Sequence, residues 1–204
     1  MLSQWREWER AGARLAACLL WAFGAAAAEY MIAPAPGARL QLEVHKTGLM
    51  SGKIHVFTFE SYSGELHYDE ASPGRSTVSF TVDNASLVCH DTWVDEKDRR
   101  KILRVAQEAM DTRRHPRMTF RSESVVSRPG GGYDVSGPLT IKGIAKPVVI
   151  HVTVERGGQS LRVRGGAVLR RADYGVNPPS PVPFGLIGNK EEMPVQFDLR
   201  AKPK

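Results

Sequence analysis

Apolar and polar residues alternate along most of the chain, a pattern typical of β-strands. Residues 39–45 place Leu40, Leu42 and Val44 on one face and polar side chains on the other. Because successive side chains of a strand point to opposite faces, this segment is expected to bury one side. The same period of two recurs in residues 64–69, 77–83, 118–122, 133–141, 147–155, 161–169 and 193–199.

One segment departs from this alternation. Between Asp95 and Met110, apolar residues recur every three or four positions, which predicts a single amphipathic helix. Its basic residues at 97–101 are interrupted by Asp98, as on an ordinary solvated face, so they do not indicate a nucleic-acid partner.

The order of the predicted elements favours an antiparallel sheet. No helix separates consecutive strands at regular intervals, so parallel crossover units are not expected. A sheet of about eight strands must fold into a sandwich or close into a barrel. A closed barrel of this size is either filled by its own side chains or holds one ligand cavity, and the period of two does not decide which.

Composition and charge describe one ordinary globular domain. The chain has 204 residues, of which 25% are charged and 42% hydrophobic, with a formal net charge of +6. These values exclude a disordered tail, and two cysteines cannot form a disulfide framework. A modest positive charge favours anionic surroundings without identifying a partner.

The N-terminus reads as an export signal. Arg6, Arg10 and Arg14 precede an uncharged apolar run at 15–28 that ends in three alanines. The run is shorter than the roughly 20 residues that span a bilayer, so a cleaved signal is favoured over an uncleaved membrane anchor. We therefore expect a signal peptide at 1–28, a single domain at 29–204, and a periplasmic or secreted protein.

Specific signals of catalysis are missing from the sequence. It contains no His-Glu-x-x-His, Cys-x-x-Cys, Gly-x-Ser-x-Gly or phosphate-loop motif. Cys89, the one cysteine after the signal, is interpreted as a small buried side chain and not as a nucleophile. No metal site is expected, because the histidines occur singly, at His45, His55, His67, His90, His115 and His151.

Two longer segments resemble the YceI-like family of exported lipid-binding or polyisoprenoid-binding proteins. They are AMDTRRHPRMTFRS at 109–122 and YDVSGPLTIKGIAKPV at 133–148. Shorter similarities are GEL at 64–66 and RADYG at 171–175, and together the four run from about Arg39 to Leu199 in family order.

This resemblance implies an all-β fold: a closed, antiparallel, lipocalin-like β-barrel, with one substantial helix that caps or covers it. It also implies a non-enzymatic carrier or scavenger of a long-chain amphipathic lipid, such as a polyprenyl phosphate, an isoprenoid quinone or a fatty-acid derivative. The lipid is the ligand, and no cofactor is expected. An apolar tube would stabilise such a chain by roughly 25 cal/mol for each Å² removed from water.

The apolar faces of the predicted strands supply the expected lining of this tube. A filled core is the alternative for each position. The predicted lining residues are Leu40, Leu42, Val44, Val78, Phe80, Val82, Met118, Phe120, Val148, Ile150, Val152 and Phe197.

Three basic residues are candidates for binding a lipid head group: Lys142, Arg170 and Arg171. A turn and a strand-end ion pair are the structural alternatives for them. The Pro-rich segment 176–190 is longer than expected for the family, and long loops in compact domains are often functional. Its apolar residues Phe184, Leu186 and Ile187 are therefore candidates for a lid.

Two other function classes remain open. A periplasmic hydrolase or metal-dependent enzyme on a β-barrel would require at least three ionisable side chains, such as His and Asp, to converge inside the barrel. An adhesion or assembly module would have a filled core. A transient membrane contact is compatible with a lipid carrier, and the sequence leaves the oligomeric state undetermined.

Overall fold

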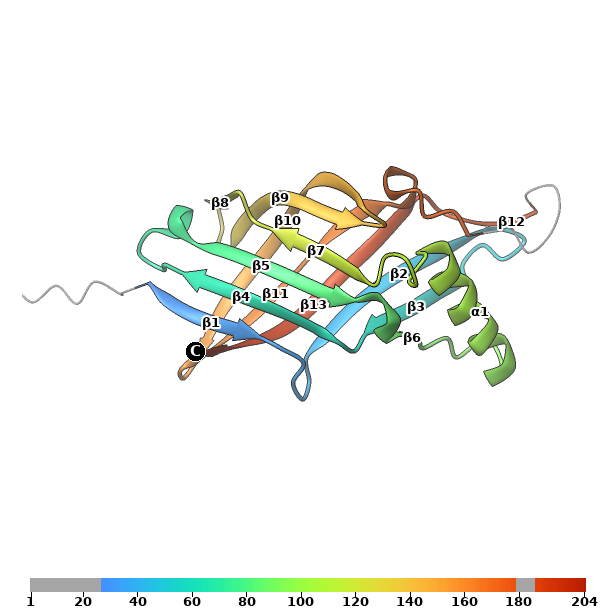
Figure 1. The fold of residues 1–204 in the computed structure, drawn as a ribbon, viewed down its shortest axis with the longest axis horizontal. Coiled ribbons are helices and arrows are strands. Elements are labelled where there is room, and N and C mark those ends of the chain that lie inside the picture. The colour runs from blue at the N-terminus through green and yellow to red at the C-terminus, as the bar shows by residue number, and fades with distance from the viewer. Residues whose placement is uncertain (1–26, 179–185) are drawn as a thin grey trace, which may run out of the picture.

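The computed structural model describes residues 27–178 and 186–204, and shows a closed antiparallel β-barrel (Figure 1). The ring closes because the first strand pairs with the last, as in the pair Ile32 and Ala201. The predicted closed barrel is confirmed. In ring order its eight strands are β1 (Ala28–Ile32), β4 (Tyr62–Tyr68), β5 (Thr77–Asp83), β7 (Arg117–Arg121), β9 (Tyr133–Ile141), β10 (Ile144–Gly157), β11 (Ser160–Arg170) and β13 (Glu192–Pro203).

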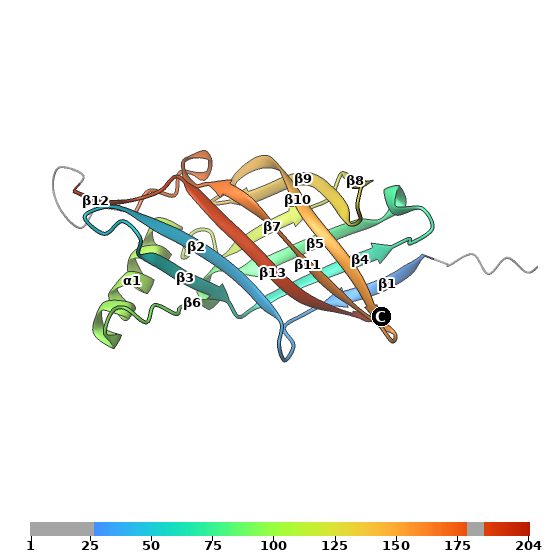
Figure 2. The ribbon, with the colours of Figure 1, turned by 180° about the vertical axis from the view of Figure 1, so that it is seen from behind.

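The sheet branches at β13, which lies between β11 and β2 in the view of Figure 2. The C-terminal end of β13 pairs with β1, whereas its residues 195–198 pair with β2 (Arg39–Gly48). Beyond β2 the sheet continues through β3 (Ile54–Phe59) to β6 (Leu87–Cys89). We call β2, β3, β6 and the helix beside them the annex.

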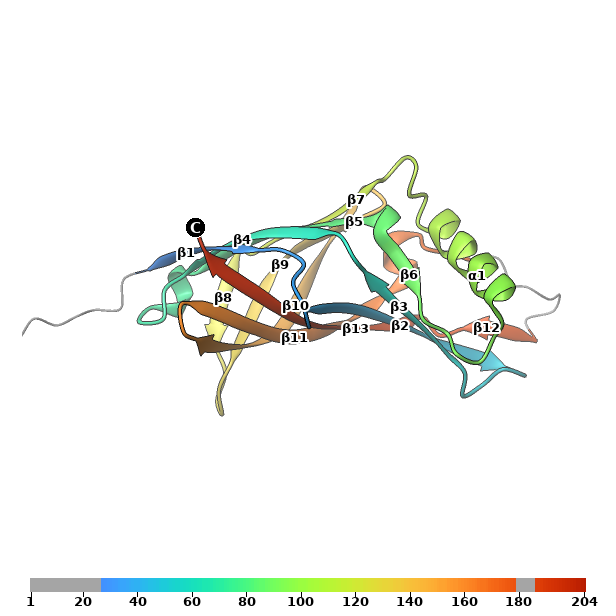
Figure 3. The ribbon, with the colours of Figure 1, turned by 90° about the horizontal axis from the view of Figure 1, so that it is seen from below.

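The predicted helix is present as α1 (Glu96–Ala109). Asp95 caps it, because its carboxylate accepts a hydrogen bond of 2.8 Å from the Asp98 backbone N–H. Within the annex the helix lies beside β6, as Figure 3 shows. Met110, which follows its last residue, is buried. None of the helices among residues 27–178 and 186–204 has the length and apolar character required to cross a membrane.

Several short elements were not predicted from the sequence. Besides β1 and β6 they are β8 (Ser124–Ser127), which pairs with β9, and β12 (Ile187–Asn189), which pairs with β2. Strands of three to five residues show too few alternations for a period of two to stand out. The remaining described elements are the 3₁₀ turns η1 (Pro73–Arg75), η2 (Asn84–Ser86) and η3 (Arg171–Tyr174).

The signal-peptide prediction concerns residues 1–28, of which 1–26 lie outside the described residues. Ala28 is the first residue of β1 and pairs with Tyr68. Cleavage after Ala28 stays a prediction.

Glycine permits the close approach of three strands near the middle of β11. A Cβ atom at Gly165 would lie 2.2 Å from the His151 carbonyl oxygen of β10 and 2.8 Å from the Phe197 ring of β13. Both neighbours belong to the ring, so the local curvature of the barrel requires a residue without a side chain here.

We therefore expect Gly165→Ala to lower the free energy of unfolding by about 1–3 kcal/mol, because the added methyl forces apart two paired strands. The control is Gly157→Ala at the end of β10, where the nearest atom to a new Cβ lies at 3.9 Å, and a change within about 0.5 kcal/mol is expected. Urea unfolding followed by circular dichroism measures both. Equal stability of the two variants would contradict the close approach.

Candidate functional site

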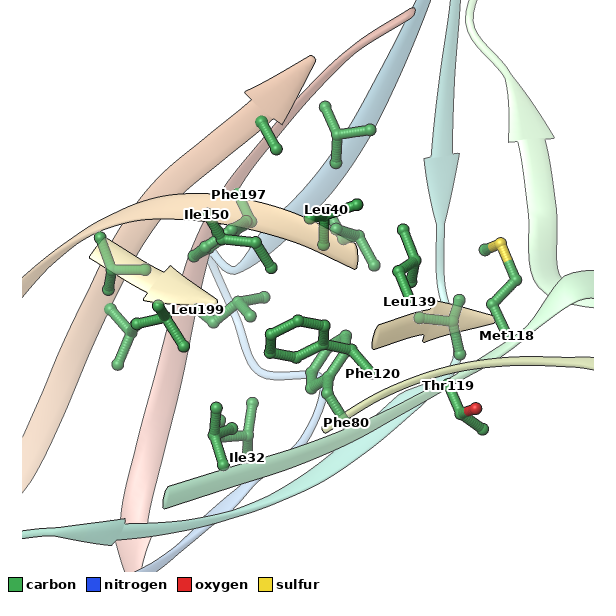
Figure 4. Close-up of a pocket in the computed structure, with 18 of the residues that line it drawn as sticks. Ile32, Leu40, Phe80, Met118, Thr119, Phe120, Leu139, Ile150, Phe197 and Leu199 are labelled. Atoms are coloured by element: carbon green, nitrogen blue, oxygen red, sulfur yellow. The ribbon is translucent and has the colours of Figure 1, made fainter. Parts of the chain in front are cut away.

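The barrel contains an extended apolar cavity with a volume of about 230 Å³. Its walls come from every strand of the ring and from β2 and β3, and Figure 4 shows aromatic and aliphatic side chains pointing into it. The interior is therefore hollow, which the period of two left undecided.

All the predicted lining residues except Val44 lie on the cavity wall. The neighbouring positions of β10 show why the pattern worked: Val148, Ile150 and Val152 line the cavity, whereas Val149 between them is 49% exposed. Whether these side chains bind a ligand stays a prediction.

The prediction for Val44 was wrong. Val44 continues the phase of Leu40 and Leu42, but it lies opposite His55 in the annex, beyond the part of β2 that pairs with β13. There it packs against the hydrophobic core without reaching the cavity. The alternation finds the face of a strand, but it does not show where the strand leaves the ring.

Other lining residues were missed, some of them although the period of two marks them. Val154 continues the phase of Val152, and Leu199 continues that of Phe197, and both lie within the segments 147–155 and 193–199 that the sequence predicts as strands. Ile32 lies on the unpredicted β1. Met110 and Val176 follow the helix and η3, where no alternation exists.

The helix end of the cavity is closed. The lining residues there come from β9, β11, β13 and the segments that follow α1 and η3, and each is only 5–9% exposed: Met110, Ile141, Leu169, Val176 and Met193. This end lies beside the C-terminus of α1, so the helix caps the barrel through Met110 and not by its full length.

Lys142 fastens this closed end and does not reach the cavity. Its ammonium donates hydrogen bonds to the backbone oxygens of Ala109, at 3.1 Å, and Gly175, at 2.7 Å. These bonds join the β9–β10 turn to the end of α1 and to η3. These contacts give Lys142 a structural role in place of the suggested role as a head-group cation. The sequence had offered a turn as the structural alternative for this residue.

The Arg171 side chain is likewise bound by other residues of the protein. Its guanidinium forms an ion pair with Glu191 and donates to the side-chain oxygen of Asn177 at 3.0 Å. Arg170 is exposed at the end of β11, paired with Glu192 in the ladder. Neither arginine lines the cavity, so the head-group prediction for this pair is not supported by their position.

Of the suggested lid residues, Phe184 lies outside the described residues. Leu186 is 53% exposed, and its carbonyl accepts a hydrogen bond of 2.9 Å from the backbone N–H of Leu49. Ile187 pairs with Gly48. Both therefore lie beside the turn between β2 and β3 in the annex and do not line the cavity.

The opposite end of the cavity, which we call the open end, has more exposed walls. Thr77 is exposed there, and Pro73, Val125 and Tyr133 are half-buried. Here the hydroxyl groups of Tyr68 and Tyr133 form a hydrogen bond of 3.0 Å.

The described cavity wall does not bring together the His and Asp side chains that the alternative of a hydrolase or metal-dependent enzyme predicts. The described lining contains no Asp, Glu, His, Lys, Arg or Cys. Within residues 27–178 and 186–204, no group of three or more His, Cys, Asp or Glu side chains is arranged to hold a metal ion.

The main buried polar cluster lies outside the barrel, in the annex. The His55 imidazole and the Asp91 carboxylate are 2.5 Å apart, and Asp91 also accepts from the Val56 backbone N–H at 2.9 Å.

Desolvation raises the pKa of the nearby Cys89 thiol to about 11. Cys89 is buried whereas His90 is exposed, as expected for neighbouring residues of a strand.

Fold and cavity together define the class: an antiparallel β-barrel protein with a closed helix end and an apolar interior. The chain belongs to the YceI-like family, since the model of the YceI-like domain matches residues 32–201. This range includes every strand of the ring except the first residues of β1 and the last of β13.

Related sequences come from several bacteria. A UPF0312 protein of Vibrio cholerae serotype O1 is 32% identical over 169 residues, which covers 79% of this chain and 85% of the relative. A UPF0312 protein of Ectopseudomonas mendocina is 40% identical over 93 residues, 46% of each chain.

Solved structures share the fold at low identity. Burkholderia cenocepacia BcnA has a TM-score of 0.62 with 23% identity, covering 80% of this chain and 96% of that protein. A polyisoprenoid binding domain from Saccharophagus degradans has a TM-score of 0.60 with 14% identity, covering 85% and 98%. At these identities the likeness concerns the fold.

The structural role of Lys142 predicts that Lys142→Met lowers the free energy of unfolding by about 1–3 kcal/mol, because two charge-assisted hydrogen bonds are lost at the closed end. Lys146→Met on the exposed part of β10 is the matched control and should change stability by less than about 0.5 kcal/mol. Urea denaturation of the two variants measures the difference. A stability of Lys142→Met equal to that of the control would refute the role.

The raised pKa of the Cys89 thiol, together with its burial, predicts slow alkylation. At about pH 8, iodoacetamide should modify the folded protein roughly 100-fold more slowly than the urea-unfolded protein, because the thiolate is the reacting species. Mass spectrometry over time follows the reaction. Similar rates in the two states would show a reactive thiol instead.

Proposed function

We propose that this protein carries or scavenges a long-chain amphipathic lipid, of isoprenoid type, inside the barrel and without catalysis. The observation that supports the proposal most is the cavity itself: an elongated space whose wall is almost wholly aliphatic and aromatic, closed at one end. A cavity lined in this way matches a molecule that is apolar along most of its length.

The energetics favour such a ligand. An apolar chain that enters the cavity removes both its own surface and the cavity wall from water, which contributes roughly 25 cal/mol per Å². The barrel is closed by pairing between its own strands, so little ordering of the protein would oppose binding. The solved domain from Saccharophagus degradans, described as polyisoprenoid binding, has the same fold and supports the isoprenoid class.

The site of action is part of the proposal. The basic residues and apolar run of 1–28 support export, which would bring the barrel to the periplasm or the exterior. A carrier there would shield an isoprenoid tail from water between membranes or on its way to an enzyme.

Filling the cavity tests this function. Ile150→Trp places a larger side chain inside the barrel, and Val149→Trp adds the same side chain one residue away on the outer face. Each protein, expressed with residues 1–28 in a Gram-negative host, is extracted with organic solvent, and the released lipid is quantified by mass spectrometry. We expect near-stoichiometric isoprenoid lipid from the wild type and from Val149→Trp, and about tenfold less or lower from Ile150→Trp.

Circular dichroism and thermal unfolding must show that both variants are folded. A wild-type protein that is purified empty and takes up no isoprenoid hydrocarbon on titration would contradict the function. Equal lipid content in the two tryptophan variants would place the lipid outside the barrel.

A further inference from the structure

The outer side of the described strand β11 carries three arginines and no acidic residue. Val163 and Leu169 of this strand line the cavity, so the residues that alternate with them point outward. Figure 2 shows β11 beside β10 and β13. The outward residues of β11, from the open end toward the closed end, are Arg162, Arg164, Gly166, Val168 and Arg170.

The neighbouring strand β13 adds two cations to this row. Arg200 lies directly opposite Arg162, and Lys202 is the next outward residue of β13. Like charges that face each other across a strand pair repel. Asp198 relieves the repulsion, because its carboxylate accepts hydrogen bonds of 2.9 Å from Arg162 Nε and 2.6 Å from Arg200 Nη1.

Positive charge remains in excess on this face. The hydrogen bond from Arg162, and then that from Arg200, lower the pKa of Asp198 far below its usual range, as expected for one carboxylate between two guanidinium groups. Glu192 is the other acidic residue on the outward positions of β13. The two strands thus present five basic side chains outward: Arg162, Arg164, Arg170, Arg200 and Lys202.

Some cations of this face have no acidic partner. Arg170 and Lys202 form no ion pair with another described residue, and neither does Arg39. Arg39 belongs to β2 and lies opposite Asp198, so it extends the basic area to a third strand. Arg164, in contrast, is paired with Glu155 of β10. The unpaired side chains are free to bind an external anion.

Two exposed valines lie on the same face. Val168 is 63% exposed, and the exposed Val149 of β10 lies next to it, since each is two residues from a member of the pair His151 and Gly166. An aliphatic side chain gains free energy when it leaves water. We call the outward residues of β11 and β13, together with Arg39 and Val149, the β11 face.

We propose that the β11 face docks on the surface of an anionic bilayer. Its arginines and Lys202 donate hydrogen bonds to phosphate oxygens of the lipid head groups, while Val149 and Val168 enter the boundary between head groups and acyl chains. The barrel then lies on its side, with β11 along the membrane. This inference concerns the outside of the barrel, so it goes beyond the proposed function and does not depend on which molecule the cavity holds.

A bilayer suits this face better than an acidic protein does. A guanidinium group offers two parallel donors to phosphate oxygens, and the cations are spread over three strands, as on a surface that meets many head groups. Protein interfaces are enriched in aromatic residues, whereas the described outward positions of β11 and β13 carry none.

The helix α1 is basic as well, but it lacks the apolar part of such a surface. Its cations alternate with Glu96, Asp98 and Glu108 along the sequence. Among residues 27–178 and 186–204, none of the exposed large apolar side chains belongs to α1. The helix therefore provides a control for the effect of charge alone.

Sedimentation with vesicles tests the charges of the face. The vesicles consist of phosphatidylcholine with or without about 30% phosphatidylglycerol. Arg39→Gln/Lys202→Gln removes two unpaired cations from the β11 face, and Lys97→Gln/Lys101→Gln removes two exposed cations from α1 with the same change in net charge. All proteins are produced with the same N-terminus, so residues 1–28 do not affect the comparison.

We expect the wild type to bind the anionic vesicles at least about tenfold more tightly than the neutral ones, and added salt to weaken this binding. The Arg39→Gln/Lys202→Gln variant should lose about 10- to 30-fold in affinity, because each cation near an anionic surface contributes roughly a factor of five. The helix variant should lose at most about twofold.

Tryptophan fluorescence tests the apolar part. Val168→Trp places the probe on the β11 face, and Val126→Trp places it on β8, where Val126 is similarly exposed, at 57%. Tryptophan favours the boundary between water and lipid, so the emission of Val168→Trp should shift to shorter wavelength with anionic vesicles. The emission of Val126→Trp should not shift, and circular dichroism checks that both variants are folded.

Equal losses of affinity in the two charge variants, or equal spectral shifts in the two tryptophan variants, would overturn the assignment to this face. A dimer in solution that Val168→Trp disrupts would overturn the bilayer as the occupant and assign the face to a second copy of the chain. Failure of the wild type to bind anionic vesicles would overturn the docking surface, whereas isoprenoid lipid extracted from the purified barrel would still support the carrier function.

Discussion

Ring closure between β1 and β13 is the interaction on which the rest of the structure depends. Without the pairing of Tyr30 with Pro203 and its neighbours, the sheet would have two edges, and its apolar face would have to pack against another layer. With it, the apolar faces of the eight strands converge on a common interior. The walls carry large side chains, yet the ring is wide enough to leave that interior open.

The two ends of the barrel differ in chemistry because different parts of the chain build them. The closed end is held by backbone oxygens that accept from Lys142, and by buried apolar side chains at the end of α1. The open end is bridged by tyrosine hydroxyls and surrounded by paired charges. The cavity therefore has two chemically different ends.

Much of the lining could be predicted because β10 and its neighbours are long and strictly alternating. The prediction failed where a strand such as β2 continues past the ring, so that Leu42 lines the cavity and Val44 does not. For the head-group candidates Arg171 and Lys142 the sequence left a structural role open, and it could not decide, because their partners, Glu191 and backbone oxygens, are not visible in it. Tyr68 and Tyr133 carry no shared motif, and only the barrel brings them together.

By itself, the sequence determined the longer strands, the helix, the face of each of these strands that turns inward and the family, because these depend on local periodicity and on contiguous motifs. The tertiary structure alone decided that the interior is hollow, which end of it is closed, and which polar groups border it. Those features depend on contacts between residues far apart in the chain, such as Tyr68 with Tyr133, and a pattern along one strand contains no information about its partners across the barrel.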